Sequence, residues 1–306
     1  MPDIIIHEVG MRDGLQMESA TMPFDTKVEW IDGLIASAVD VIQVGSFVHP
    51  TKVPQMADTD RLFTHFLQPG RKPSRVVLSG LVLNEKGFER GEACGVEMYC
   101  MGVSASETHS MKNTGMSVSD ATQRIIGAAL QGVKAGKRVQ VSVQSAFGCG
   151  FEGPIPADRV LGIVGRYLEA GLRTISLADT AGHAHPAQVE ALCASVMGLD
   201  PGLELACHFH NTYGLGLANC HVAIQMGVRS LESAFGGLGG CPFTKQPSGN
   251  VCTEDLVHYL QRTGRRSDIS VGSLITVAKA ASAFFGRDLP GYVYKSGPLR
   301  VAATST

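Results

Sequence analysis

Short apolar runs recur along the chain, separated by stretches in which apolar residues return every three or four positions. The runs are mostly continuous rather than alternating, which is typical of strands in a parallel sheet that is buried on both faces. They predict strands at residues 4–9, 39–44, 75–83, 95–103, 138–147, 174–179, 204–210 and 230–235.

The stretches between these runs predict helices. Several of them end in a glycine or another small residue directly before the next strand, as in "LEAGLRTISL" and "EACGVEMYC". Short loops from a helix to a strand require such residues. The expected helices cover residues 25–38, 59–67, 84–92, 117–136, 156–170, 186–198, 214–226 and 253–263.

Strands and helices that alternate over about 260 residues predict an α/β fold, and their number matches a (β/α)8 TIM barrel. A doubly wound open sheet is the alternative, but it would need a glycine-rich phosphate loop after an early strand. The segment "GMRDGLQ" after the first strand is not such a loop. We therefore expect a single TIM-barrel domain over residues 1–306, with the barrel at 3–265 and a short C-terminal helical extension at 268–306 that includes an apolar helix at 271–285.

The amino-acid composition limits which kinds of molecule this protein is expected to bind. The 306 residues carry a formal charge of −2, so nothing indicates a nucleic acid or another polyanion. No run reaches the roughly 20 apolar residues of a membrane span, and the N-terminus lacks the basic start of an export signal. The eight cysteines form no CxxC pair. We therefore expect a cytoplasmic protein with reduced thiols and no membrane partner.

Polar residues near the carboxyl ends of the predicted strands are the candidates for function, because the active site of a TIM barrel lies at that end. They are Arg12, Asp13 and Gln16 after the first strand, Gln43 in the second, Asn84 after the third, Ser145 in the fifth, Asp179 at the end of the sixth, His208 and His210 in the seventh, and Cys241 and Asn250 in the glycine-rich loop after the eighth.

The pattern "HFH" indicates a metal site. Residues two apart on a strand face the same side, so His208 and His210 can reach one ion together. With Asp13 they offer two nitrogens and one oxygen, which suits Mg²⁺ or Mn²⁺, while zinc and cobalt stay open. A pair of core histidines is the alternative interpretation. Three protein ligands, with Asn250 as a further candidate, would leave positions open for substrate oxygens.

Several of these segments together resemble a known family. "GMRDGLQ", "SFVHPTKVPQMAD", "SLADT", "HFHNTYGLGLAN" and "GGLGGCPFTKQPSGNVCTEDLV" are similar to motifs of the 3-hydroxy-3-methylglutaryl-CoA lyase family. This family is a branch of the metal-dependent TIM-barrel lyases and synthases that also contains isopropylmalate and homocitrate synthases. The resemblance covers residues 4–285, and the "GGLGGCP…SGN" segment is specific to the lyase branch.

The resemblance implies a role for each candidate. Arg12 would neutralise the oxygen of an enolate, and Cys241 would act in acid–base chemistry on a loop that closes over the substrate. Asp179 and Glu254 would be proton-handling or supporting carboxylates. The implied metal ligands are Asp13, His208, His210 and Asn250, and the implied substrate-binding residues are Gln16, Gln43, Asn84 and Ser145.

The expected reaction is metal-dependent retro-aldol (Claisen-type) cleavage of a branched 3-hydroxyacyl-CoA to acetyl-CoA and a keto product. Gln43 departs from the family, in which a glutamate stands at this position, and "MES" after "RDGLQ" lacks the usual lysine. We therefore expect the substrate to be 3-hydroxy-3-methylglutaryl-CoA or a related compound such as citramalyl-CoA. A synthase that condenses acetyl-CoA with a 2-oxo acid and a non-enzymatic metal-binding protein are the alternatives. The resemblance also suggests a homodimer.

Overall fold

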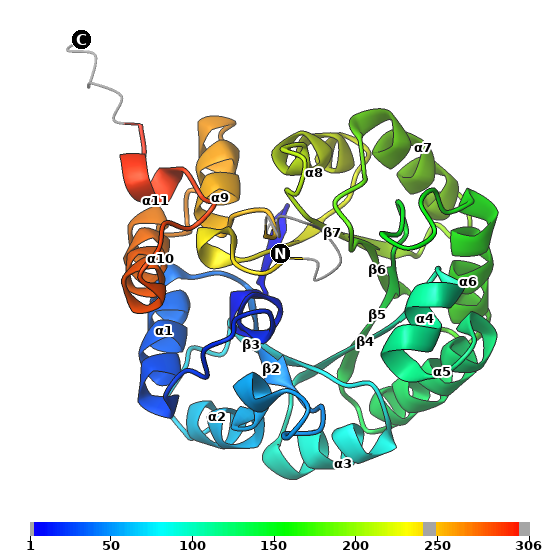
Figure 1. Cartoon of the computed structure of the whole chain (residues 1–306), viewed down its shortest axis with the longest axis horizontal. Coiled ribbons are helices and arrows are strands. Elements are labelled where there is room, and N and C mark those ends of the chain that lie inside the picture. Colours follow the sequence, from blue (N-terminus) through cyan, green and yellow to red (C-terminus); the bar gives the residue numbers. More distant parts are fainter. Residues whose placement is uncertain (1–2, 241–248, 300–306) are drawn as a thin grey trace.

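The computed structural model describes residues 3–240 and 249–299, and its centre is a closed barrel of parallel strands (Figure 1). Each strand pairs with the next along the chain, and the last pairs with the first from Ile5 opposite Ser230 to Glu8 opposite Ser233. The predicted TIM barrel is confirmed. The strands are β1 (Ile5–Glu8), β2 (Val41–Ser46), β3 (Val77–Leu81), β4 (Met98–Ser104), β5 (Arg138–Gln144), β6 (Thr174–Asp179), β7 (Glu204–Phe209) and β8 (Ser230–Ser233).

Helices surround the barrel on its outside (Figure 1). The sequence did not predict α4, which follows β4 directly, nor the π-helical turn Gly10–Gly14, which follows β1. The helices are α1 (Phe24–Ser37), α2 (Thr59–Phe66), α3 (Glu85–Cys94), α4 (Glu107–Thr114), α5 (Val118–Lys134), α6 (Ala157–Glu169), α7 (Pro186–Met197), α8 (Gly216–Gln225), α9 (Thr253–Arg262), α10 (Val271–Phe285) and α11 (Val293–Ser296).

Local sequence fixes where these helices begin and end. The Ser117 side chain accepts a hydrogen bond from the Asp120 backbone N–H and thereby caps the start of α5. Gly95 ends α3 with a φ of 83°, a left-handed conformation that glycine adopts without steric cost. The chain turns there directly into β4, as the helix-to-strand pattern predicted.

The apolar core lies mainly between the sheet and the helices. Trp30 of α1 is buried there and packs edge-to-face against Phe235, which follows β8. Inside the barrel, a small apolar cluster of Val41, Val77, Met98 and Cys100 forms a separate group. Two residues further along β2, Gln43 lines an open pocket instead. The buried His7, which hydrogen-bonds with the Ser79 side chain at 2.8 Å, adds polar groups close to this cluster.

The C-terminal part of the chain covers one side of the barrel. Helix α10 packs beside α1, and the short α11 follows it (Figure 1). The predicted apolar helix at 271–285 coincides with α10. Among residues 3–240 and 249–299, no helix is long and apolar enough to cross a membrane.

Candidate active site

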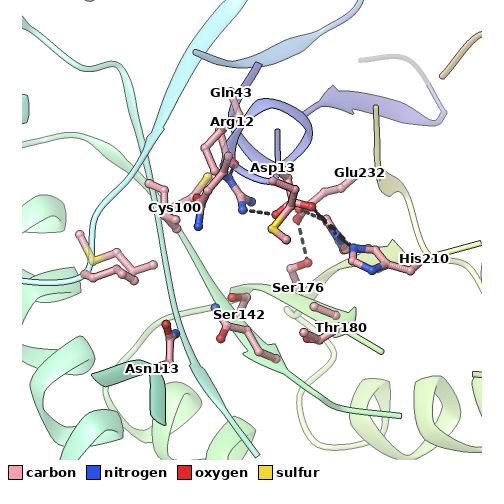
Figure 2. A pocket seen from close by; sticks show the side chains of 18 of the residues that line it. Arg12, Asp13, Gln43, Cys100, Asn113, Ser142, Ser176, Thr180, His210 and Glu232 are labelled. Atoms are coloured by element: carbon pink, nitrogen blue, oxygen red, sulfur yellow. Dashed lines mark hydrogen bonds and ion pairs between the residues drawn. The ribbon is translucent and has the colours of Figure 1, made fainter. Parts of the chain in front are cut away.

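A pocket opens at the carboxyl ends of the barrel strands and is lined mostly by polar side chains (Figure 2). The first turn after β1 contributes Arg12, Asp13 and Gln16, and β2 contributes Gln43. His208 and His210 reach the pocket from β7 and from the residue after it. Residues that lie far apart in the sequence therefore meet in one pocket, as expected for the active-site end of a TIM barrel.

Asp13, His208 and His210 form a compact cluster in this pocket, with ligand atoms that all lie within 4.8 Å of one another. The two imidazoles face each other with their Nε2 atoms 3.1 Å apart. Asp13 Oδ2 lies 3.6 Å from His210 Nε2 and 3.9 Å from His208 Nε2. Ligands bound at about 2.1 Å from one ion lie roughly 3 to 4 Å apart, so the cluster fits a single metal ion.

Asn250 stands beside this cluster. Its Nδ2 donates to Asp13 Oδ2 at 2.9 Å and to the Leu238 carbonyl at 2.9 Å. Its Oδ1 is buried and has no hydrogen-bond partner among the described residues. A buried polar atom without a partner is costly, and a bound ion or ligand would satisfy it. Because Nδ2 is the atom that faces Asp13, Asn250 would serve as the predicted further ligand through Oδ1 with its amide group turned over.

The charge states of Asp13 and His210 suit metal binding, whereas for His208 burial would lower the pKa but the hydrogen bond to Glu232 raises it. Burial alone would raise the pKa of Asp13, but the adjacent Arg12 charge and the His210 hydrogen bond hold that pKa well below its usual range. Burial lowers the pKa of His210, which favours the neutral imidazole. A carboxylate and a neutral imidazole are the forms that ligate a metal.

Glu232 of β8 contacts His208 of the cluster, and the sequence analysis did not predict it as a site residue. Its Oε2 lies 2.9 Å from His208 Nδ1, while its Oε1 accepts from Gln140 at 2.7 Å and from Ser176 at 2.8 Å. Burial would raise the pKa of Glu232, but the His208 hydrogen bond lowers it to about 2. The carboxylate therefore fixes the ring of His208 with Nε2 toward the cluster, as carboxylates beside metal-bound histidines do. A lone glutamate within the apolar run "SLESAF" was the available signal.

Arg12 lies within the π-helical turn that follows β1. Its Nε donates to Gln43 Oε1, and its Nη1 donates to Asp13 Oδ1 (Figure 2). The Arg12 side chain is only 13% exposed. These contacts hold a permanent positive charge beside Asp13, His208 and His210, which we call the metal-type cluster. There the charge can stabilise negative charge that develops on a substrate oxygen.

Two predicted carboxylates are buried outside the pocket lining. Asp179 accepts hydrogen bonds from the backbone N–H groups of His183 and Ala184, and burial raises its pKa to about 7. Glu254 accepts from the backbone N–H of Gly236, where the glycine-rich loop begins, and burial raises its pKa to about 7. Both groups can exchange a proton near neutral pH, but neither lines the pocket.

The remaining predicted residues lie in different places. Asn84 caps α3 by accepting from the Gly87 N–H, and it lines a separate groove rather than the pocket. Ser145 is buried with a φ of 55°, and its N–H donates to Thr180, which does line the pocket. Cys241 lies outside the described residues, so its predicted role stays a prediction.

Comparison with known proteins places this geometry in a family. The HMGL-like family model matches residues 3–280 of the chain. The chain belongs to the HMGL-like family. Membership implies a divalent metal, and the cluster of Asp13, His208 and His210 is the possible site for it.

Relatives with similar lengths are lyases. The chain is 36% identical to (R)-citramalyl-CoA lyase of Chloroflexus aurantiacus over 98% of this chain and 96% of that protein. It is 33% identical to hydroxymethylglutaryl-CoA lyase YngG of Bacillus subtilis over 96% and 98%. The solved structure of an HMG-CoA lyase from Acinetobacter baumannii with coenzyme A and 3-methylmalate aligns with a TM-score of 0.89, at 35% identity over 98% of each chain.

Replacing Glu232 with glutamine is expected to weaken binding of Mn²⁺ about ten- to a hundredfold, because the neutral amide no longer orients and polarises His208. Calorimetric titration of the purified variant with Mn²⁺ measures this change. Glu204→Gln, at the exposed start of the same strand β7, is the matched control and should bind Mn²⁺ like the wild type. Equal affinities for all three proteins would contradict the supporting role of Glu232.

Proposed function

We propose that this chain is a divalent-metal-dependent carbon–carbon lyase that cleaves a branched 3-hydroxyacyl-CoA into acetyl-CoA and a keto product. The observation that carries the proposal is the position of Arg12 directly beside the cluster of Asp13, His208 and His210, in one pocket at the mouth of the barrel. Retro-aldol cleavage needs a Lewis acid at the substrate hydroxyl and a positive charge at the thioester oxygen. A divalent ion held by the cluster would supply the first, and Arg12 supplies the second.

Mg²⁺ or Mn²⁺ is the proposed ion, with Asp13, His208, His210 and Asn250 as its ligands, and it would supply Lewis acidity at the substrate oxygens. Arg12 stabilises the enolate oxygen of the departing acetyl thioester. The substrate hydroxyl loses its proton to a base, and the enolate carbon gains one from an acid. Asp179, Glu254 and Cys241 are the proposed proton-handling residues.

The pocket wall gives the proposed substrate contacts. Gln16 and Gln43 line the pocket with uncharged amides that can donate to or accept from substrate oxygens. Ser145 and Asn84 are also proposed substrate-binding residues, Ser145 through its neighbour Thr180 in the pocket and Asn84 from the separate groove. The A. baumannii relative was solved with coenzyme A, which supports an acyl-CoA as the substrate of this chain.

The reverse reaction, in which acetyl-CoA condenses with a 2-oxo acid, is not favoured, because the relatives described above are named as lyases. We further propose that the enzyme is a homodimer in the cytoplasm. Analytical ultracentrifugation of the purified protein tests the dimer.

Product analysis tests the proposed function. The Mg²⁺-loaded protein is incubated separately with 3-hydroxy-3-methylglutaryl-CoA and citramalyl-CoA, and the products are identified by mass spectrometry. We expect acetyl-CoA together with acetoacetate or pyruvate, in equal molar amounts, and no reaction after chelation. Hydrolysis to free CoA, or no turnover of either compound, would overturn the proposal.

A further inference from the structure

The hydrogen-bond partners of Arg12 leave part of its guanidinium group available. Nε donates to Gln43 and Nη1 donates to Asp13, and within the described residues Nη2 has no protein partner. The side chain lines the pocket, so the free edge can meet a ligand there. A guanidinium edge with free N–H groups binds a carboxylate in a planar, two-pronged geometry.

Gln43 makes the wall next to Arg12 neutral. It is 1% exposed, lines the pocket from β2, and uses its oxygen to accept from Arg12. Its amide nitrogen interacts with Cys100 and keeps a second N–H that can donate to a ligand. A carboxylate on a ligand at this position meets N–H donors from both side chains and no negative charge from residue 43.

The other negative charges of the pocket are already engaged. Among the described residues that line it, the carboxylates are Asp13 and Glu232. Asp13 contacts Arg12 and faces the two histidines, and Glu232 accepts from His208, Gln140 and Ser176. Arg12 therefore has no carboxylate partner besides Asp13 in the part of the chain that the structure describes, and a ligand can supply one.

The free edge of Arg12 and the amide of Gln43 together form an anion site, and its position restricts where the substrate can carry its carboxylate. Arg12 and Asp13 are adjacent in sequence and in contact. A substrate carboxylate bound at Arg12 therefore lies next to the part of the substrate that faces the cluster of Asp13, His208 and His210. A carboxylate attached directly to the hydroxyl-bearing carbon C3 reaches both positions at once. A CH₂ spacer moves the carboxylate farther away by one bond of about 1.5 Å.

We propose, as a refinement that rests on the lyase function above, that the substrate carries a carboxylate directly on C3 and that Gln43 determines this specificity. The C2–C3 bond breaks, its electron pair goes to C2 as the acetyl-CoA enolate, and the C3 hydroxyl loses its proton as a C=O bond forms. C2 then takes up a proton. The products are acetyl-CoA and a 2-oxo acid, and no oxidant or reductant is needed.

Replacing a neutral glutamine of the pocket with the equally sized but charged glutamate tests this inference. We expect the wild type to cleave citramalyl-CoA with a kcat/KM at least tenfold above that for 3-hydroxy-3-methylglutaryl-CoA. Gln43→Glu puts a negative charge beside the bound carboxylate and should lower the ratio of the two kcat/KM values roughly ten- to a hundredfold. Gln144→Glu adds the same charge to the same pocket from β5, three strands along the barrel from Gln43 on β2, and should leave the ratio within about threefold of the wild-type value.

A measurement on the wild type alone covers the case in which Gln43→Glu does not fold. Calorimetry on the Mg²⁺-loaded protein should show that pyruvate binds at least tenfold more tightly than acetoacetate. Equal or better cleavage of 3-hydroxy-3-methylglutaryl-CoA, or a ratio that Gln43→Glu leaves unchanged, overturns the inference while the lyase function stands. Cleavage of neither compound overturns the lyase function and this inference with it.

Discussion

Replacing Arg12 with glutamine is expected to lower kcat about a thousandfold and also to raise KM, since the same guanidinium binds the proposed C3 carboxylate. The enolate oxygen carries a full negative charge only as the carbon–carbon bond breaks, so Arg12 stabilises the transition state more than the bound substrate. Loss of one preorganised donor at such an oxygen typically costs about 10²–10³ in kcat, and Arg12 also supplies a full charge in a partly buried site. Steady-state kinetics of acetyl-CoA release measure the change.

Arg12→Lys is the matched variant, because it keeps the charge but lacks the planar fork that contacts Gln43 and Asp13 together. It should recover part of the lost rate. Circular dichroism and Mn²⁺ affinity serve as controls for folding and for the adjacent metal-type cluster. A rate within tenfold of the wild type for Arg12→Gln would show that the guanidinium does not stabilise the enolate.

Replacing Arg266 with methionine is expected to lower the free energy of unfolding by about 3 kcal/mol. Arg266 is 5% exposed and lies after α9. It donates to the Ile4 carbonyl, to Asp40 at 2.6 and 3.2 Å, and to Asp268 at 2.9 and 3.0 Å. Removal of the guanidinium leaves the partly buried Asp40 carboxylate, which also accepts from the Ile6 N–H, without its cation.

Urea unfolding monitored by circular dichroism measures this loss. Arg265→Met is the control, because the neighbouring Arg265 makes an exposed ion pair with Asp3, and such pairs contribute about 1 kcal/mol or less. Because Arg266 joins the amino-terminal ends of the first strands, far from the mouth of the barrel, folded Arg266→Met should keep its kcat. Equal midpoints for the two variants would contradict the structural role of Arg266.

Much of the fold and of the metal-type cluster could be predicted because each depends on a simple periodicity. Continuous apolar runs that alternate with helical stretches predicted the barrel, and the spacing of His208 and His210 placed both rings on one face of β7. Asp13 could join them because the carboxyl ends of barrel strands meet at one face. These inferences require only the backbone geometry.

The supporting contacts depend on barrel closure and on side-chain direction, which the sequence pattern does not reveal. Glu232 reaches His208 because β7 and β8 pair with these two residues opposite each other. The side chain of Asn84, which is predicted to bind substrate, caps α3, a local hydrogen bond that asparagine forms readily. The sequence likewise gave no apolar stripe strong enough to predict α4 at the mouth of the barrel.

The most direct test of metal-dependent cleavage is a titration of metal-free, chelator-treated protein with Mn²⁺. The rate of acetyl-CoA release is measured with citramalyl-CoA and with 3-hydroxy-3-methylglutaryl-CoA, and bound Mn²⁺ is counted in the same samples. We predict that cleavage appears in proportion to bound ion and reaches its maximum at one Mn²⁺ per chain. In His210→Ala both signals should be lost. Full activity in the chelated protein, or one bound Mn²⁺ per chain with no cleavage of either compound, would contradict it.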